Sequence, residues 1–155
     1  MKRNKKKLNN KGFSLVELII VIAIMAILSG ALAPQLIKYL DKSRKAADVQ
    51  AAQTIATAVN TALTNEDAFT AAANMTLSEL YAKPDTDKFA KAVKEVLGGT
   101  TSPTPKYKTG GYVDFYIDFN ASKEFTVSAS KSNVTASITL DEKDVMYPKV
   151  GDNFK

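Results

Sequence analysis

A run of 21 residues, Phe13–Ala33, contains a single ionisable side chain, that of Glu17. At about 1.5 Å per residue, an α-helix of this length spans roughly 31 Å, close to the hydrocarbon thickness of a bilayer, about 30 Å. A helix is the one single-segment structure that lipid permits, because it satisfies its backbone hydrogen bonds internally. The run therefore predicts a membrane-spanning helix over residues 13–34, with Pro34 at its end.

Glu17 is the unusual residue in this helix. A carboxylate at the centre of a membrane costs about 2.5–3.5 kcal/mol. Glu17 is only four residues from Phe13, about 6 Å along the helix axis, so tilt or local water would relieve much of that cost. Two interpretations remain open: a tolerated acid near the interface, or an acid that meets a cationic partner at this depth.

Residues 11–18 read KGFSLVEL, behind a short basic leader and ahead of the apolar run. This segment resembles the class III signal of type IV prepilins and pseudopilins. The resemblance implies that a prepilin peptidase cleaves after Gly12 and that the new N-terminal residue, Phe13, is N-methylated. It also implies that Glu17 pairs with the N-terminal amine of a neighbouring subunit during assembly, which would supply the missing cation.

The charge of the chain is unevenly distributed. Six of the 21 Lys and Arg residues fall within residues 1–12, where there is no acid, leaving 15 basic against 16 acidic side chains in the rest. Such a cluster predicts a leader that the positive-inside rule keeps in the cytoplasm, and we expect no nucleic-acid partner. The chain has no Cys and no His, which excludes disulfides and Cys or His catalysis. With no catalytic constellation in the sequence, we expect no enzyme.

An ordinary secretory signal is the rival interpretation of the apolar run. Ala31-Leu32-Ala33 has the small-x-small pattern of a cleavage site, and a cut after Ala33 would release a secreted binding domain. Two features oppose it. The run is longer than the usual 7–15 residues of a signal core, and the ring of Pro34 would fit poorly in a protease cleft.

Residues 35–64 continue the helical pattern. Two i, i+4 pairs are expected, Asp41 with Lys45 and Arg44 with Asp48. An apolar stripe follows at three- and four-residue spacing, made of Val49, Ala52, Ile55, Ala56, Val59, Ala62 and Leu63. The sequence therefore predicts one helix from Phe13 to about Thr64, bent at Pro34, whose second half is amphipathic.

Residues 65–111 read as a connecting region with two short helices. Thr76 and Glu79 fit a capping box for the first, and Asp85 or Thr86 is expected to cap the second, which glycine ends at Gly98.

Residues 112–155 predict an antiparallel sheet and a tail. Period-two alternation indicates strands over 112–119, 125–130 and 134–140, joined by connections short enough for hairpins. In the first strand, Tyr112, Asp114, Tyr116 and Asp118 alternate with apolar residues and are expected on the outer side. We expect an α+β fold in which the sheet, of three to four strands, packs on the amphipathic half of the long helix. Residues 141–155 are expected to form a polar tail.

Four acids in that tail raise the question of a metal: Asp141, Glu142, Asp144 and Asp152. Oxygen ligands suit calcium, and pseudopilins of type II secretion hold calcium near their C-terminus. The spacing does not match an EF-hand, so a solvated turn without cofactor is the favoured interpretation.

The sequence thus favours a pilin: a single-pass protein of the plasma (inner) membrane that becomes the subunit of an extracellular type IV pilus for adhesion, twitching motility or biofilm. Its expected partners are copies of itself, the prepilin peptidase/methyltransferase, the assembly platform protein and ATPase, and minor pilins. The alternatives are a pseudopilin of a type II secretion or DNA-uptake system and the secreted domain cut after Ala33.

Overall fold

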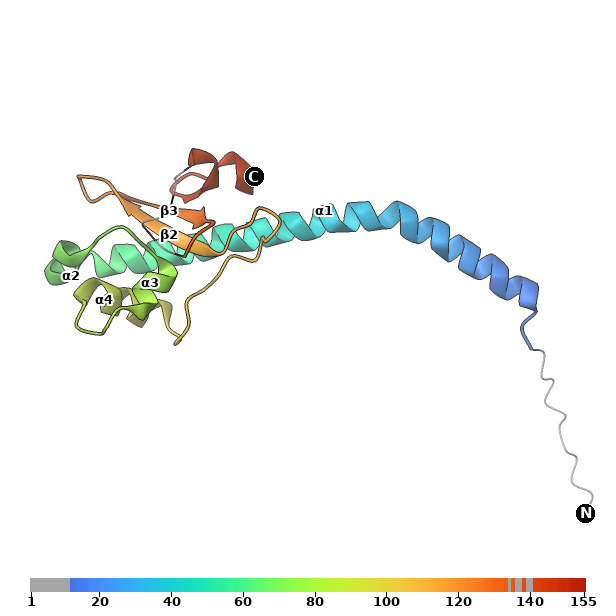
Figure 1. Ribbon diagram of the computed structural model, residues 1–155, viewed down its shortest axis with the longest axis horizontal. Helices are drawn as coiled ribbons and strands as arrows, with labels where there is room; N and C mark the ends of the chain where they lie inside the picture. The colour runs from blue at the N-terminus through green and yellow to red at the C-terminus, as the bar shows by residue number, and fades with distance from the viewer. Residues whose placement is uncertain (1–11, 134, 136–137, 139–140) are drawn as a thin grey trace, which may run out of the picture. The chain divides into compact units, whose positions relative to one another are not determined.

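The computed structural model describes residues 12–133, 135, 138 and 141–155 (Figure 1). The chain divides into two compact units, of which the first ends at Tyr39 and the second is Leu40–Lys155. All strands and short helices of the described chain belong to the second unit.

The long N-terminal helix is confirmed. Helix α1 is Leu15–Ala62, so each end lies within two residues of its predicted place. It continues through Pro34, although a proline removes one backbone hydrogen bond. The bend predicted at Pro34 stays a prediction.

The apolar stripe on the second half of α1 lies in the core of the second unit. Its buried members, at three- and four-residue spacing, are Ala52, Ile55, Ala56, Val59 and Ala62. Ala58 is also completely buried. Four of these six side chains are alanine, which lets neighbouring segments approach the helix backbone closely.

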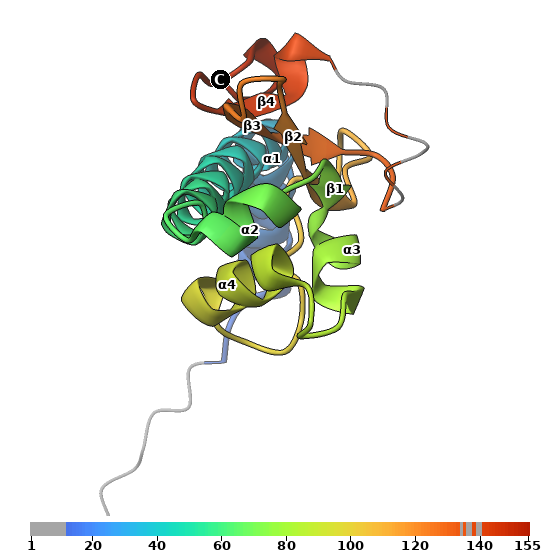
Figure 2. The ribbon, with the colours of Figure 1, turned by 90° about the vertical axis from the view of Figure 1, so that its left-hand side faces the viewer.

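A four-stranded antiparallel sheet packs on this helix, as predicted. The strands are β1 (Met75–Thr76), β2 (Asp114–Phe119), β3 (Phe125–Ser130) and β4 (Val145–Tyr147), in the order β1-β2-β3-β4. The β2–β3 hairpin pairs Phe115 with Ala129 and Ile117 with Val127. The apolar residues of the two strands therefore lie opposite each other on the same face of the sheet. Figure 2 shows α2, α3 and α4 gathered beside the end of α1.

Short helices fill the connecting region. They are α2 (Glu66–Ala71), α3 (Leu77–Ala82) and α4 (Lys88–Leu97). The predicted capping box at Thr76 and Glu79 is confirmed. The predicted cap of the next helix at Asp85 or Thr86 is wrong: Asp87 caps α4, accepting the Ala90 N–H at 2.9 Å. After Pro84 the chain makes a turn before the helix begins, and in this turn the Asp87 N–H donates a hydrogen bond to the carbonyl of Pro84.

Strand β2 is buried on both sides over most of its length. The alternation predicted a polar outer side containing Asp114 and Tyr116, yet both are buried. Helix α3 covers this side, and the Asp114 carboxylate accepts the backbone N–H groups of Ser78, at 3.0 Å, and Phe115, at 2.8 Å. A buried carboxylate is tolerated because these donors replace its water.

The C-terminal segment differs from its prediction. The strand expected over 134–140 falls largely outside the described residues; Thr135 and Ile138 are described, and neither is in a strand. On the side away from β2, β3 pairs with β4. Residues 141–155 are wrongly predicted as a polar tail, because they contain β4 and two 3₁₀ turns, η2 (Glu142–Asp144) and η3 (Asp152–Phe154), and because Met146 and Phe154 pack into the core.

Candidate functional site

The N-terminal segment presents the predicted cleavage and assembly residues at the start of α1. Gly12 and Phe13 are exposed, Phe13 to 93%, and a Cβ added at Gly12 would meet nothing within 4 Å. The peptide bond between them is therefore sterically accessible in the described chain. Whether a peptidase cuts there, and whether Phe13 is methylated, stay predictions.

Glu17 lies in the first turn of α1 and caps it. Its Oε2 accepts the backbone N–H of Ser14 at 2.8 Å, while the Leu18 N–H bonds to the Ser14 carbonyl at 3.2 Å. The carboxylate satisfies a donor that has no helical partner, and its charge is favourable near the helix N-terminus. Glu17 is exposed, so its second oxygen can accept a donor from another molecule.

The first half of α1 has no packing partner in the described chain. Every residue from Gly12 to Leu40 is exposed, including large apolar side chains such as Ile19, Ile24 and Leu28. An 18-residue window of the helix reaches a mean hydropathy of 2.7 with none of it buried, which makes α1 a candidate membrane span by length and composition. Exposure of so much apolar surface is stable only in lipid or against other protein.

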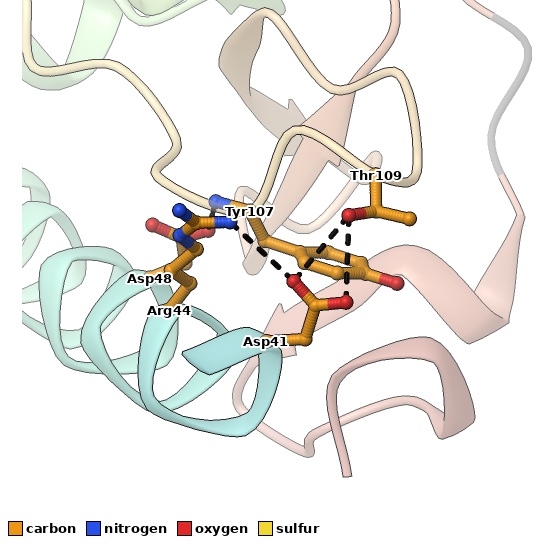
Figure 3. A network of polar contacts seen from close by, with 5 residues as sticks. All are labelled: Asp41, Arg44, Asp48, Tyr107 and Thr109. Atoms are coloured by element: carbon orange, nitrogen blue, oxygen red, sulfur yellow. Dashed lines mark hydrogen bonds and ion pairs between the residues drawn. The ribbon is translucent and has the colours of Figure 1, made fainter. Parts of the chain in front are cut away.

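A polar network in the second unit fastens the loop before β2 to α1 (Figure 3). Asp48 is buried, with 1% of its surface exposed. Its carboxylate oxygens accept the backbone N–H groups of Lys106, at 2.6 Å, and Tyr107, at 2.8 Å. Two helix turns earlier, Asp41 accepts the Thr109 hydroxyl at 3.4 Å and pairs with Arg44 at 3.5 Å.

The network corrects the expected pairing of charges on α1. Arg44 was predicted to pair with Asp48, but it pairs with Asp41, and no ion pair among the described residues joins Asp41 to Lys45. Asp48 is occupied by the loop, and Lys45 lies over the ring of Tyr107, with Nζ 5.0 Å from its centroid. The sequence offered a signal for Asp48, since it precedes the buried Ala52 by four residues and so shares the buried side of the helix.

A second cluster holds the C-terminal segment without a disulfide. The Tyr112 hydroxyl donates to Asp144, and the Asn153 amide donates to Asp144 at 2.6 Å. The ring of Phe154 lies 5.1 Å from that of Tyr112 and 6.0 Å from that of Tyr107. We call these residues the C-terminal clasp: Tyr107, Tyr112, Asp144, Asn153 and Phe154. Sequence reasoning missed it, because its members are far apart in the chain.

Removing the Tyr112 hydroxyl is expected to weaken the clasp. Burial, and then the hydrogen bond to Asp144, raise the pKa of Tyr112 above its ordinary value of 10. A group whose pKa is higher in the folded state loses its stabilising effect as pH rises, since the unfolded chain ionises first. We expect Tyr112→Phe to lower the free energy of unfolding by about 1–2 kcal/mol at neutral pH and to weaken the loss of stability above pH 10.

Urea unfolding followed by circular dichroism at pH 7 and at pH values above 10 measures both effects. Tyr39→Phe is the control, because Tyr39 is exposed. Equal unfolding curves for the Tyr112→Phe variant and the parent chain at both pH values would contradict the prediction.

The four acids considered as calcium ligands have other partners or lie apart. Asp141 caps η2 through the Lys143 N–H at 2.9 Å, Asp144 belongs to the C-terminal clasp, and Asp152 pairs with Lys155 at 2.6 Å. In residues 12–133, 135, 138 and 141–155, no three acids, histidines or cysteines gather closely enough to hold a metal ion. Glu142 is exposed.

Residues 7–33 match the family model of the prokaryotic N-terminal methylation motif, the class III signal peptide of type IV pilins and pseudopilins. The match contains Gly12, Phe13, Glu17 and the apolar run. It supports a pilin-like or pseudopilin protein, hence a structural subunit and not an enzyme at the level of the family. No curated protein and no solved structure matches the chain.

Proposed function

We propose that this protein is a structural subunit of a type IV pilus. The observation that carries the proposal is the coincidence of two features in one segment. The methylation motif covers residues 7–33, and from Leu15 to Leu40 every residue of the continuous helix that overlaps it is exposed. A signal for N-terminal processing therefore adjoins an apolar surface that needs a partner.

In this proposal the precursor is a single-pass protein of the plasma membrane. Residues 1–12 are its cytoplasmic leader, 13–34 its membrane and assembly helix, and 35–64 the amphipathic half of that helix, followed by the connecting region 65–111 and the sheet region 112–155. A prepilin peptidase/methyltransferase removes the leader and methylates the new N-terminus. The assembly platform protein and ATPase then move subunits into a surface filament.

Glu17 has a defined part in this assembly. In the described chain it already accepts the Ser14 N–H, and cleavage after Gly12 places a new amine one residue further toward the N-terminus. We propose that its carboxylate neutralises the amine of an incoming Phe13 in the apolar filament core. Such a pair gains little net stability but fixes the alignment of helices, because a misaligned subunit would leave a charge unpaired.

The N-terminal residue and mass of this protein in fibres sheared from the cell surface test the proposal. We expect N-methylated Phe13, because the helix must reach the filament intact. Recovery of a chain that starts at Pro34, free in the medium, would contradict the proposal and favour a secreted domain. Methylated Phe13 in a protein that stays in the membrane fraction and never appears in surface fibres would favour a pseudopilin.

A further inference from the structure

Basic side chains gather at the start of the second unit. Three lie on α1 just after Leu40 and two lie in the loop before β2, and we call them the basic collar: Lys42, Arg44, Lys45, Lys106 and Lys108. All are exposed except Lys45, which is partly buried.

The contacts of the loop with α1 bring these two groups together. Lys106 and Tyr107 donate their backbone N–H groups to Asp48, and Thr109 reaches Asp41. Figure 3 shows the loop running along the first turns of α1 in this unit. Residues more than 58 positions apart thus form one surface. Lys45 lies against the ring of Tyr107, and Tyr107 is flanked in the chain by Lys106 and Lys108.

The acids within the collar do not cancel its charge. Asp41 pairs with Arg44, and Asp48 is buried with both oxygens bound to the loop. The loop 98–111 itself contains no acid. Five cations against these two acids leave a local charge of +3, although the chain after the leader has slightly more acids than bases. No ion pair in the described part of the chain involves Lys42 or Lys106.

We propose that the basic collar binds anionic lipid headgroups while the precursor is anchored in the membrane. The inference rests on the proposed function, because it takes Phe13–Ala33 as the membrane span. Lys42 follows Ala33 by nine residues, a helical path of about 14 Å. The headgroup layer occupies about 5–8 Å of that path. The rest can be covered by the lysine side chain, which extends several ångströms, and by the range of its charge, about 8 Å at physiological ionic strength. Basic residues at this range are attracted to anionic leaflets.

The full-length precursor, reconstituted in vesicles, tests the collar. The chain has no cysteine, so Thr104→Cys gives a unique fluorophore site on the exposed part of the loop. Vesicles consist of phosphatidylcholine alone, or with about one third phosphatidylglycerol, and contain lipid with a nitroxide on its headgroup. We expect phosphatidylglycerol to increase quenching of the fluorophore about twofold, and about 0.5 M salt to abolish the increase.

Lys42→Gln/Lys106→Gln in the labelled chain is expected to lose this increase, since the local charge falls from +3 to +1. Lys88→Gln/Lys149→Gln, which removes the same charge from exposed lysines elsewhere in the unit, is expected to keep it. Equal thermal melting of both variants and the parent establishes that the fold is unchanged.

Each of the following results would overturn the inference. Quenching that is independent of phosphatidylglycerol, or lost equally in both variants, would show that the collar does not bind headgroups. A fluorophore signal that changes only with the protein-to-lipid ratio would show that the collar contacts a second copy of the chain and not lipid. A precursor that fails to float with neutral vesicles would overturn the membrane-anchored precursor of the proposed function as well, whereas normal flotation without a lipid effect overturns the collar alone.

Discussion

Glu17→Ala and Glu17→Gln are both expected to enter the membrane normally and to reduce surface fibres about a hundredfold or more. Removing one partner of a buried ion pair leaves the other charge uncompensated, at a cost of about 3–5 kcal/mol. In the proposed filament the uncompensated group is the amine of a neighbouring Phe13. Immunoblots of sheared fibres and of membrane fractions measure the two quantities separately.

The two substitutions separate the charge of Glu17 from its capping bond. In the parent chain the Glu17 carboxylate accepts a hydrogen bond from the Ser14 N–H at 2.8 Å. Glutamine retains an oxygen that can accept the same hydrogen bond, and it occurs at this position of capping boxes. Alanine removes both charge and bond. Normal fibre yield from the Gln variant together with loss in the Ala variant would contradict the amine-pairing role and assign Glu17 to helix capping.

Asp48→Ala is expected to destabilise the second unit by about 3 kcal/mol. The substitution removes two charge-assisted hydrogen bonds, each of which contributes about 1.5–3 kcal/mol, and it leaves the N–H groups of Lys106 and Tyr107 without their acceptor. The loop would then detach from α1. Urea unfolding of the full-length chain in detergent, followed by circular dichroism, measures the effect.

Asp48→Asn is expected to fall between the parent and the Ala variant, since the amide oxygen accepts one N–H while the amide nitrogen faces the other. Asp41→Ala is the matched control on the same helix and loop. Its pair with Arg44 is partly exposed, and such pairs contribute at most about 1 kcal/mol. An Asp41→Ala variant as unstable as Asp48→Ala would show that the buried carboxylate has no special part in holding the loop.

The regular elements were predictable where one periodicity dominates. The stripe of α1 from Ala52 to Ala62 and the alternation in β2 and β3 follow directly from side chains that must leave water. The capping box at Thr76 was predictable for another reason: all of its bonds are made within four residues.

The prediction failed where burial depends on segments far apart in the sequence. Val145–Tyr147 is too short to show a period, and it becomes a strand through its pairing with β3. Asp114 looks like an outward polar residue until α3 supplies a donor at Ser78. The sequence places Phe154 in a predicted polar tail, whereas in the structure its ring packs against those of Tyr107 and Tyr112.

The sequence by itself determined the character of the N-terminal segment, which contains the methylation motif at residues 7–33 and the apolar run. The apolar run forms a helix from Leu15, whose backbone hydrogen bonds are local, and Glu17 caps its first turn. In the proposed function, the partner of this helix is lipid or another copy of the same helix. Only the tertiary structure decided how the second unit is held together. The bonds of Asp48 to the loop and of Tyr112 to Asp144 join residues 32 to 59 positions apart, and a spacing of that size has no periodic trace in the sequence.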